Sequence, residues 1–353
     1  MDIAIIGAAG TCGRQLAVQL VEGRFMLPDA RLQLVGHRGG ASEHELWAIR
    51  ADIKDAFVDD APEIELAFEP EEVNADIVVM LAGATVPSDP SKPFDRARLG
   101  RDNRRMFEGY ANALAQRAGQ MPIVIVQSNP VELGVHVFAE QLGRHRVVGA
   151  GGWLDTMRFR GEIAAELGVS RLQVHGYMLG QHGMHLVPTW SQLQVKGVDQ
   201  AAIAALVDRT RSGRPMSVFP EEISREMGRL KELIEGGDIK AAFDFVMSLP
   251  VDLRTAIKPF FIHYTSGRTS EVAPSYAVAD MVAHFIRGES RIFPAQVALD
   301  GEWLDLDGVI SVPVLIGLDG WESVYPLDLA DDEITALKTA CQSVQDAIVG
   351  TDR

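Results

Sequence analysis

The chain has little cysteine and no long apolar run. Its 353 residues include only two cysteines, Cys12 and Cys341, far apart in the sequence. This spacing excludes a disulfide framework and a Cys-x-x-Cys metal or redox pair, and it fits a reducing compartment. No stretch approaches the roughly 20 apolar residues of a membrane-spanning helix, and the first residues lack the basic segment of a signal peptide. We therefore expect a cytoplasmic protein without a membrane partner.

Positive charge is also scarce. Lys and Arg number 33 against 49 Asp and Glu, which gives a net charge of −16. Nucleic-acid binding depends on basic faces that neutralise phosphate, so a nucleic-acid partner is not expected. Hydrophobic residues at 47% are ordinary for a globular protein. The length suggests about two domains at roughly 150 residues each.

Apolar runs alternate with helical stretches in the first 150 residues. Short β-prone runs cover residues 3–6, 32–35, 77–81 and 123–126, and helical spacing covers residues 14–21 and 106–118. The acidic segment 59–72 reads as a loop that forms a solvated edge. Strands separated by helices are typical of βαβ units. We therefore expect an α/β fold whose residues 1–150 form a Rossmann domain with a doubly wound parallel sheet.

Residues 151–353 show a different pattern, which predicts a second, α+β domain. Helical periodicity covers residues 154–167 and 331–349, and residues 172–179 read as a strand. Residues 298–324 read as strand pieces joined by Asp-Gly turns at 300–301, 307–308 and 319–320. A helical insertion extends over about residues 200–262, with helices expected at 201–211, 220–235 and 239–247.

A glycine-rich turn follows the first predicted strand. Glycines at this point permit a tight turn and let a pyrophosphate approach the N-terminus of the next helix. A merely flexible turn is the alternative, but the position between strand and helix favours dinucleotide binding. The residues expected to contact the cofactor are Gly7, Ala9, Gly10, Thr11, Cys12 and Gly13.

The end of the second strand bears on the choice of cofactor. An acidic residue there binds the ribose hydroxyls in NAD enzymes, but here Val35 is followed by Gly36, His37 and Arg38. His37 and Arg38 offer room and positive charge to a 2′-phosphate, which arginine can bind bidentately. We therefore expect NADP, with NAD possible. The alternative is that Arg38 is a solvated loop charge.

Asp155, Arg158 and His182 form a candidate acid/base site. Asp155 and Arg158 are three residues apart on a predicted helix and share a face, where a surface ion pair is the simplest use. His182 follows a predicted strand and is flanked by Gly180 and Gly183. A carboxylate that orients one imidazole nitrogen leaves the other free to exchange a proton, and arginine can hold a substrate carboxylate. The three residues together favour catalysis.

In order along the chain, these motifs resemble those of the lactate/malate dehydrogenase superfamily of 2-hydroxyacid dehydrogenases. Residues 7–13 are similar to its glycine fingerprint, 128–131 to its Asn-Pro-Val turn, 154–159 to its Leu-Asp-x-x-Arg-Phe motif and 180–183 to its Gly-x-His-Gly motif. The resemblance implies a Rossmann domain followed by an α+β catalytic domain, hydride transfer at C2 of a 2-oxoacid or 2-hydroxyacid, and a homodimer or homotetramer. Residues 36–38 also resemble the plastid NADP-linked malate dehydrogenases.

The resemblance also implies roles for single residues. His182 would be the general acid/base, with Asp155 as its orienting partner. Arg158 would hold the 2-carboxylate and Asn129 the reacting oxygen, while Arg96 on a mobile loop would polarise the carbonyl. The remaining implied positions are Thr269 beside the substrate side chain, and Gly83, Asn103 and again Asn129 at the cofactor.

The mobile loop departs from the family pattern. Malate dehydrogenases of this family carry an arginine at its start for the distal carboxylate, and lactate dehydrogenases commonly carry glutamine. Residues 84–92 contain no arginine; Ser88 falls nearest that position, and Lys92 is the cation of this segment. An unpaired desolvated carboxylate is costly. Either Lys92 replaces the arginine in binding the substrate, or the substrate is not malate.

Three other functions compete with an NADP-preferring dehydrogenase. They are an NAD-linked malate dehydrogenase, an NAD-dependent glycosidase-like hydrolase and a dinucleotide-binding sensor without turnover. Such glycosidases need a metal held by Cys and His. The sequence has cysteine only at positions 12 and 341, neither of which fits such a site, so we expect no metal. The presence of Asp155, Arg158 and His182 favours the dehydrogenase over the sensor.

Overall fold

The structure is a computed structural model that describes residues 1–27, 29–85 and 96–351, with the backbone alone for residues 96–98. Ser88 and Lys92 therefore lie outside the described residues, as does the side chain of Arg96. In the part that is described, no helix combines the length and apolar composition needed to cross a membrane.

The first half of the chain forms the expected doubly wound parallel sheet. Its strands lie in the order β3-β2-β1-β4-β5-β6, and every pair is parallel. The chain leaves β1 toward β2 and β3 and then returns to the other side at β4, so a switch point adjoins β1. The strands are β1 (Ile3–Ile6), β2 (Arg31–Val35), β3 (Glu63–Ala67), β4 (Ile77–Met80), β5 (Ile123–Val126) and β6 (Val147–Gly149).

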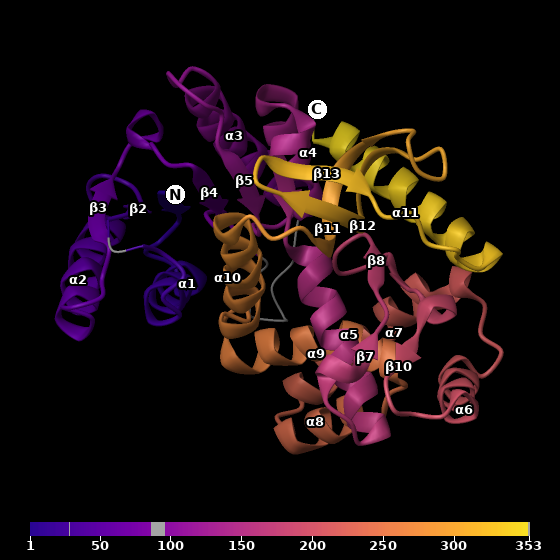
Figure 1. Cartoon of the computed structure of the whole chain (residues 1–353). Coiled ribbons are helices and arrows are strands. Elements are labelled where there is room, and N and C mark those ends of the chain that lie inside the picture. The colour runs from indigo at the N-terminus through magenta and orange to yellow at the C-terminus, as the bar shows by residue number, and fades with distance from the viewer. Residues whose placement is uncertain (28, 86–95, 352–353) are drawn as a thin grey trace.

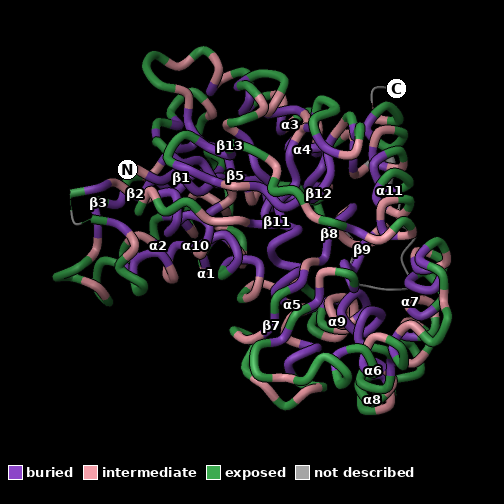
Figure 2. The backbone as a smooth tube through the Cα atoms, turned by 45° about the vertical axis from the view of Figure 1, so that its right-hand side comes forward, coloured by how far each residue is buried: buried purple, intermediate pink, exposed green. Residues whose placement is uncertain are grey.

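Helices cover both faces of this sheet (Figure 1). Every residue of β1, β4 and β5 is buried, as the purple central strands of Figure 2 show. Along β1, Ile3 and Ile5 join one apolar cluster while Ala4 and Ile6 join another, because successive side chains point to opposite faces. The helices of this half are α1 (Thr11–Glu22), α2 (Ala41–Ala56), α3 (Arg96–Ala115) and α4 (Val131–Leu142).

The acidic segment 59–72 forms a solvated edge, as expected, but it is not all loop, because it contains β3. Ile64 and Ala67 point inward and are buried, whereas Glu63 and Glu65 are exposed. The strand lies at the edge of the sheet. Exposed carboxylates suit an edge strand because they discourage pairing with another chain.

The sheet continues into the second half of the chain. β11 (Arg291–Asp300) pairs antiparallel with β6, and β12 (Asp307–Gly317), β8 (Met178–Gly180) and β9 (Leu186–Pro188) follow, with β13 (Gly320–Val324) also on β12. One sheet thus crosses residue 150, where a domain boundary is expected. The helices around this part are α5 (Gly151–Leu167), α9 (Val251–Ser266), α10 (Val272–Arg287) and α11 (Asp331–Gly350).

Two expectations for this half are wrong. Residues 172–179 are not one strand: a single 3-10 turn precedes β7 (Val174–His175), which pairs with β10 (Gln194–Val195) in a separate two-stranded sheet, and β8 follows. Two of the three Asp-Gly pairs lie where hairpins close: 319–320 between β12 and β13, and 300–301 at the start of the loop between β11 and β12, where Asp300 pairs with Asp307 and the Gly301 nitrogen donates to the Leu306 oxygen. Residues 307–308 instead lie within β12. β11 also begins at Arg291, before the expected residue 298.

The helical insertion contains α6 (Gln200–Arg211), α7 (Phe219–Glu235) and α8 (Ile239–Ser248), close to the expected ranges. Buried ion pairs attach the insertion to the body: Arg254 contacts Glu162 at 2.6 Å and Glu166 at 2.7 Å. Single 3-10 turns complete the described elements: Pro70–Glu72, Arg144–Arg146, Arg171–Gln173, Trp190–Gln192 and Met216–Val218.

Gly152 tests the close packing of α5 on the sheet. A Cβ at this residue would lie 2.0 Å from Ser311 Oγ and 3.0 Å from the carbonyl oxygen of Pro294. We predict that Gly152→Ala lowers the free energy of unfolding by about 1–3 kcal/mol through overpacking. Gly161 in the same helix has open space around its Cβ position, so Gly161→Ala should raise stability by about 0.5–1 kcal/mol. Equal unfolding midpoints for the two variants in urea would contradict the close contact.

Candidate active site

The glycine turn between β1 and α1 is packed so tightly that side chains would not fit. The φ angle of Gly7 is +87°, and a Cβ there would lie 2.6 Å from the Ala82 nitrogen. A Cβ on Gly13 would lie 2.4 Å from the Gly7 oxygen. Gly10 precedes α1, and no side chain caps the first amides of this helix in the described structure. Those amides are therefore available to an anion such as a pyrophosphate.

Cys12 joins this turn to the segment that precedes α10. Its thiol donates to the Ser270 oxygen at 3.4 Å, and Ser275 Oγ donates to the Cys12 oxygen at 2.9 Å. Burial, with a further contribution from the charge of Glu271, raises the pKa of the Cys12 thiol to about 11. The thiol is therefore neutral near pH 7. Figure 1 shows α10 beside α1, and the side chain of Thr269 contacts the Cys12 thiol, which places Thr269 close to the glycine turn.

Asn103 holds the backbone at Ala84. Its buried amide accepts a hydrogen bond from the Ala84 nitrogen at 2.8 Å and donates to the Ala84 oxygen at 3.0 Å and the Asn129 oxygen at 2.6 Å. Both amide hydrogens of Asn103 are thus used within the protein. The φ angle of Gly83 is +152°, and a Cβ there would lie 3.2 Å from Asn103 Nδ2. Asn129 itself is exposed beyond β5.

Arg38 is exposed at the end of β2, next to His37, and lies near two carboxylates. Its guanidinium is 3.5 Å from Glu69 and 3.4 Å from Glu72, and it stacks over the Phe68 ring at 5.2 Å. Such exposed ion pairs contribute little and can be exchanged for another anion.

The catalytic candidates from two distant segments meet in the structure. Asp155 lies on α5, and His182 lies in the loop between β8 and β9. His182 Nδ1 and Asp155 Oδ2 are 2.6 Å apart, and Arg158 Nη1 donates to the other carboxylate oxygen at 3.2 Å. Both side chains of the His–Asp pair are mostly buried, with 14% and 6% exposed. This geometry fixes the imidazole through Nδ1 and leaves Nε2 for proton exchange.

The charges of the pair act on each other. Burial opposes protonation of His182, but the Asp155 carboxylate outweighs it, so the pKa of the imidazole lies above its usual value. Burial lowers the pKa of Arg158 despite the attraction of Asp155. Guanidinium groups titrate so far above neutrality that Arg158 keeps its charge.

Glu132 is a site residue that the sequence reasoning missed. It lies on the first turn of α4, three residues after Asn129, and is only 3% exposed. Its Oε1 accepts a hydrogen bond from the His182 backbone nitrogen at 2.8 Å. Gln296 Nε2 approaches the same oxygen at 3.4 Å, and Gln296 Oε1 accepts from the Gly152 nitrogen. Burial raises the pKa of Glu132 above its usual value. The sequence signal for Glu132 is a carboxylate that directly follows the Asn-Pro-Val turn and lies within an apolar stretch.

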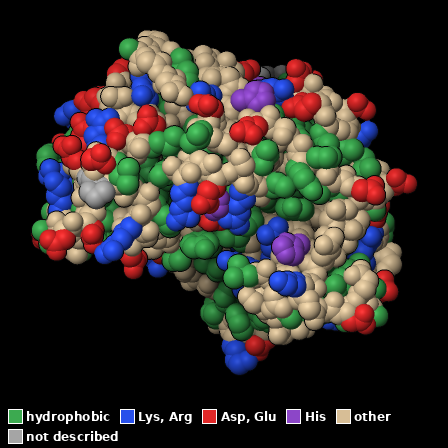
Figure 3. All heavy atoms as spheres, viewed as in Figure 1, with side chains coloured by type: hydrophobic (Ala, Val, Ile, Leu, Met, Phe, Trp, Pro, Cys, Tyr) green, Lys and Arg blue, Asp and Glu red, His purple; other side chains and the backbone are tan. Residues whose placement is uncertain are grey.

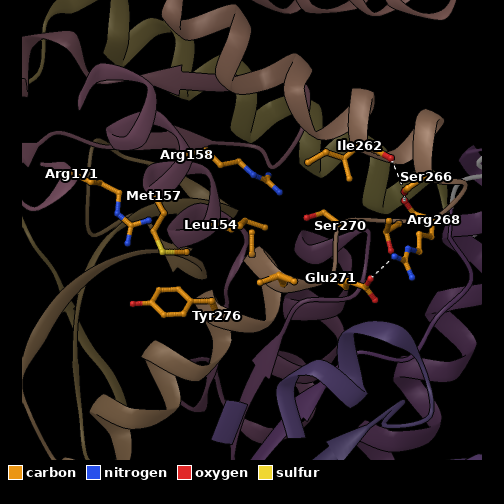
Figure 4. A pocket seen from close by; sticks show the side chains of 13 residues that line it. Leu154, Met157, Arg158, Arg171, Ile262, Ser266, Arg268, Ser270, Glu271 and Tyr276 are labelled. Carbon is orange, nitrogen blue, oxygen red and sulfur yellow. Dashed lines mark hydrogen bonds and ion pairs between the residues drawn. The ribbon is translucent and has the colours of Figure 1, made fainter. Parts of the chain in front are cut away.

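A cavity of about 660 Å³ is lined by Arg158, the arginine that contacts Asp155. Arg158 and Thr269 both line it, as do residues from α9 and α10 (Figure 4). The volume lies within the range of about 300–1,000 Å³ that is usual for small-molecule sites. Among the described residues, no three His, Cys, Asp or Glu side chains come together as they would around a metal ion.

Charged side chains of both signs are interspersed on the face of the molecule drawn in Figure 3. This mixture shows no continuous basic surface there of the kind that nucleic acid requires.

Comparisons with known proteins agree with this geometry. Two family models match: the lactate/malate dehydrogenase NAD binding domain over residues 1–149, and the lactate/malate dehydrogenase alpha/beta C-terminal domain over residues 265–350. The malate dehydrogenase of Trichormus variabilis is 34% identical over 279 residues, which cover 76% of this chain and 70% of that protein. The L-2-hydroxycarboxylate dehydrogenase (NAD(P)(+)) of Methanocaldococcus jannaschii is 27% identical over 98% and 97% of the two chains.

The fold also matches that of the malate dehydrogenase from Aeropyrum pernix. The TM-score is 0.73, with 23% identity over 99% of this chain and 97% of the other. The shared fold, the two matched domains and the relative with 34% identity together show that the chain belongs to the lactate/malate dehydrogenase family, as an oxidoreductase that uses a nicotinamide dinucleotide and acts on a small molecule.

Proposed function

We propose that the protein interconverts a 2-oxoacid and the corresponding 2-hydroxyacid, with NADP as the preferred cofactor and His182 as the general acid/base. The observation that carries this proposal is the 2.6 Å contact between His182 Nδ1 and Asp155 Oδ2, next to a cavity that Arg158 lines. A bound dinucleotide fits the glycine turn, because the turn leaves the first amides of α1 uncapped, and the glycines at 7 and 13 let the backbone pack tightly enough to form it.

In the reducing direction, a bound cofactor supplies the hydride that C2 of the oxoacid receives. Protonated His182 gives its Nε2 proton to the substrate oxygen, so that the carbonyl becomes a hydroxyl. Asp155 keeps the imidazole oriented throughout and stabilises its charged form. Arg158 holds the 2-carboxylate of the substrate through paired hydrogen bonds. Oxidation of the hydroxyacid reverses these steps, with neutral His182 accepting the proton.

The other polar residues of the site act on the reacting oxygen and the cofactor. Asn129 hydrogen-bonds the reacting oxygen, and Arg96 polarises the carbonyl when its loop closes and excludes water. Asn103 acts by holding Ala84 and Asn129, since both of its amide hydrogens are used there. Thr269 lies beside the substrate side chain, where the cavity begins.

The preference for NADP rests on Arg38. No carboxylate ends β2, and Arg38 with His37 can face a 2′-phosphate. Glu69 and Glu72 are close enough to Arg38 to offset part of its charge, which supports an NAD-linked malate dehydrogenase as the second candidate. That candidate requires Lys92 or Ser88 to serve the distal carboxylate.

Assembly as a homodimer or homotetramer in the cytoplasm belongs to the same proposal. An exposed apolar side chain on α2 supports it, since Trp47 is 53% exposed. Sedimentation at equilibrium would give a single-chain mass if the proposal of assembly is wrong.

His182→Asn tests the proposed chemistry. The variant cannot exchange a proton at Nε2, so we predict that kcat for reduction of the best 2-oxoacid falls by about 100- to 10,000-fold, while the Kd of the cofactor changes less than twofold. Stopped-flow absorbance of the reduced nicotinamide and a fluorescence titration measure the two quantities. The matched control is His175→Asn, at an exposed position on β7. A His182 variant as fast as this control would refute the assigned role.

Asp155→Asn tests the raised pKa of His182. Reduction needs the protonated imidazole, so kcat/KM is highest at low pH and falls as the pH rises through the pKa of His182. Removing the Asp155 charge lowers that pKa, and we predict that the midpoint of the fall moves to lower pH by about one unit or more. The measurement is a pH profile of kcat/KM for both enzymes. A midpoint that stays in place would mean that Asp155 does not set the ionisation.

Arg38→Ala tests the choice of cofactor. We predict that the Kd of NADPH rises about tenfold, which corresponds to about 1.4 kcal/mol, while the Kd of NADH stays within twofold. Fluorescence titration of both nucleotides provides the values. Arg24→Ala is the control, since Arg24 is an exposed arginine paired with Asp60. An equal loss for both nucleotides would leave the NADP preference without support.

A further inference from the structure

The cavity beyond Arg158 extends well past the space that a 2-oxoacid group needs. Its floor comes from α5, one wall from the end of α9, and the other wall from the start of α10. About half of the lining side chains are apolar: Leu154, Met157, Ile262, Val272, Ala273 and Tyr276. A volume of about 660 Å³ exceeds what pyruvate or oxaloacetate fills.

The charged groups of the cavity are already paired or lie at its ends. Arg158 contacts Asp155 and is assigned to the 2-carboxylate. Arg268 is 61% exposed and pairs with Glu271 at 3.1 Å. In Figure 4, Leu154 and Ile262 flank the guanidinium of Arg158, whereas Arg171 and Arg268 lie at opposite ends of the cavity. A substrate side chain that extends from the 2-carboxylate site therefore meets aliphatic carbon first.

Ile262 is the residue of α9 that gives this wall its apolar character. It is 38% exposed although it is a large apolar side chain, and it faces the cavity together with Ser266 one turn later. On the opposite wall, Ala273 and Thr269 are small and leave room. The hydroxyls of Ser266 and Thr269 can tolerate an apolar neighbour, but neither offers the charge that a distal carboxylate requires.

We propose that this cavity receives the side chain of the substrate, and that the preferred substrates are 2-oxoacids with apolar side chains larger than methyl, either branched aliphatic or aromatic. This inference rests on the proposed function, because it assumes that Arg158 holds the 2-carboxylate. Each CH₂ group buried in the cavity improves binding about fourfold. A side chain three carbons longer than that of pyruvate should therefore raise kcat/KM by tenfold or more.

The first experiment compares kcat/KM of the full-length enzyme on pyruvate, 2-oxoisocaproate, phenylpyruvate, oxaloacetate and 2-oxoglutarate. Values for 2-oxoisocaproate or phenylpyruvate at least tenfold above pyruvate and both dicarboxylates support the inference. A preference for pyruvate or for a dicarboxylate overturns it and leaves the proposed function intact. Cofactor binding without turnover of any of the five overturns both.

The second experiment changes the wall itself. Ile262→Phe reduces the cavity and should lower the ratio of kcat/KM for 2-oxoisocaproate over pyruvate by about tenfold, whereas Ile262→Ala enlarges it and should favour phenylpyruvate. The control is Ile239→Phe, the same change at a 45% exposed position on α8, which should leave the ratio as in the wild type. Unchanged ratios in both Ile262 variants would overturn the assignment of this cavity to the substrate side chain.

Discussion

The buried amide of Gln296 holds the junction on which the active site depends. Its backbone pairs β11 with Gly149 of β6, its Oε1 accepts from the Gly152 nitrogen, and its Nε2 approaches Glu132. Gln296 is fully buried, and a buried amide without partners would be costly, so these contacts are maintained together. Asp155 follows Gly152 by one helical turn, and Glu132 holds the backbone of His182. One side chain thus connects both halves of the sheet to both members of the His–Asp pair.

The charges of the site are arranged around a single carboxylate. Asp155 contacts His182 with one oxygen and Arg158 with the other. The same carboxylate therefore orients the imidazole, which is assigned to proton transfer, and the guanidinium, which is assigned to the substrate. Glu132 lies behind His182 and contacts its backbone. The sequence suggests the first carboxylate through its spacing from Arg158. It does not suggest the second, because a buried glutamate has no periodic signature and its role depends on a strand 164 residues away.

Sequence reasoning succeeded where a local pattern decides the structure. The buried parallel strands are continuous apolar runs, and the glycine turn has its own signature at Gly7 and Gly13. It failed where the tertiary environment decides. β3 was not predicted, because a strand at the sheet edge tolerates exposed residues such as Glu63 and Glu65. The Asp307–Gly308 pair has the composition of a turn, but it begins strand β12. The sequence also does not predict that Ile262 lines a cavity, because this depends on α9 lying across from α5.

The hydrogen bonds of Cys12 have a thermodynamic consequence. They connect the first turn of α1 to Ser270, which lines the cavity, and to Ser275 on α10. A ligand that orders the glycine turn would also order Ser270 in the wall of the cavity, so a second ligand would pay less of the entropic cost of ordering. Linkage requires the effect to be reciprocal: whatever factor the dinucleotide adds to the affinity for the oxoacid, the oxoacid adds to the affinity for the dinucleotide. Through these contacts, Cys12 would couple the two ligands without contacting the bond that reacts.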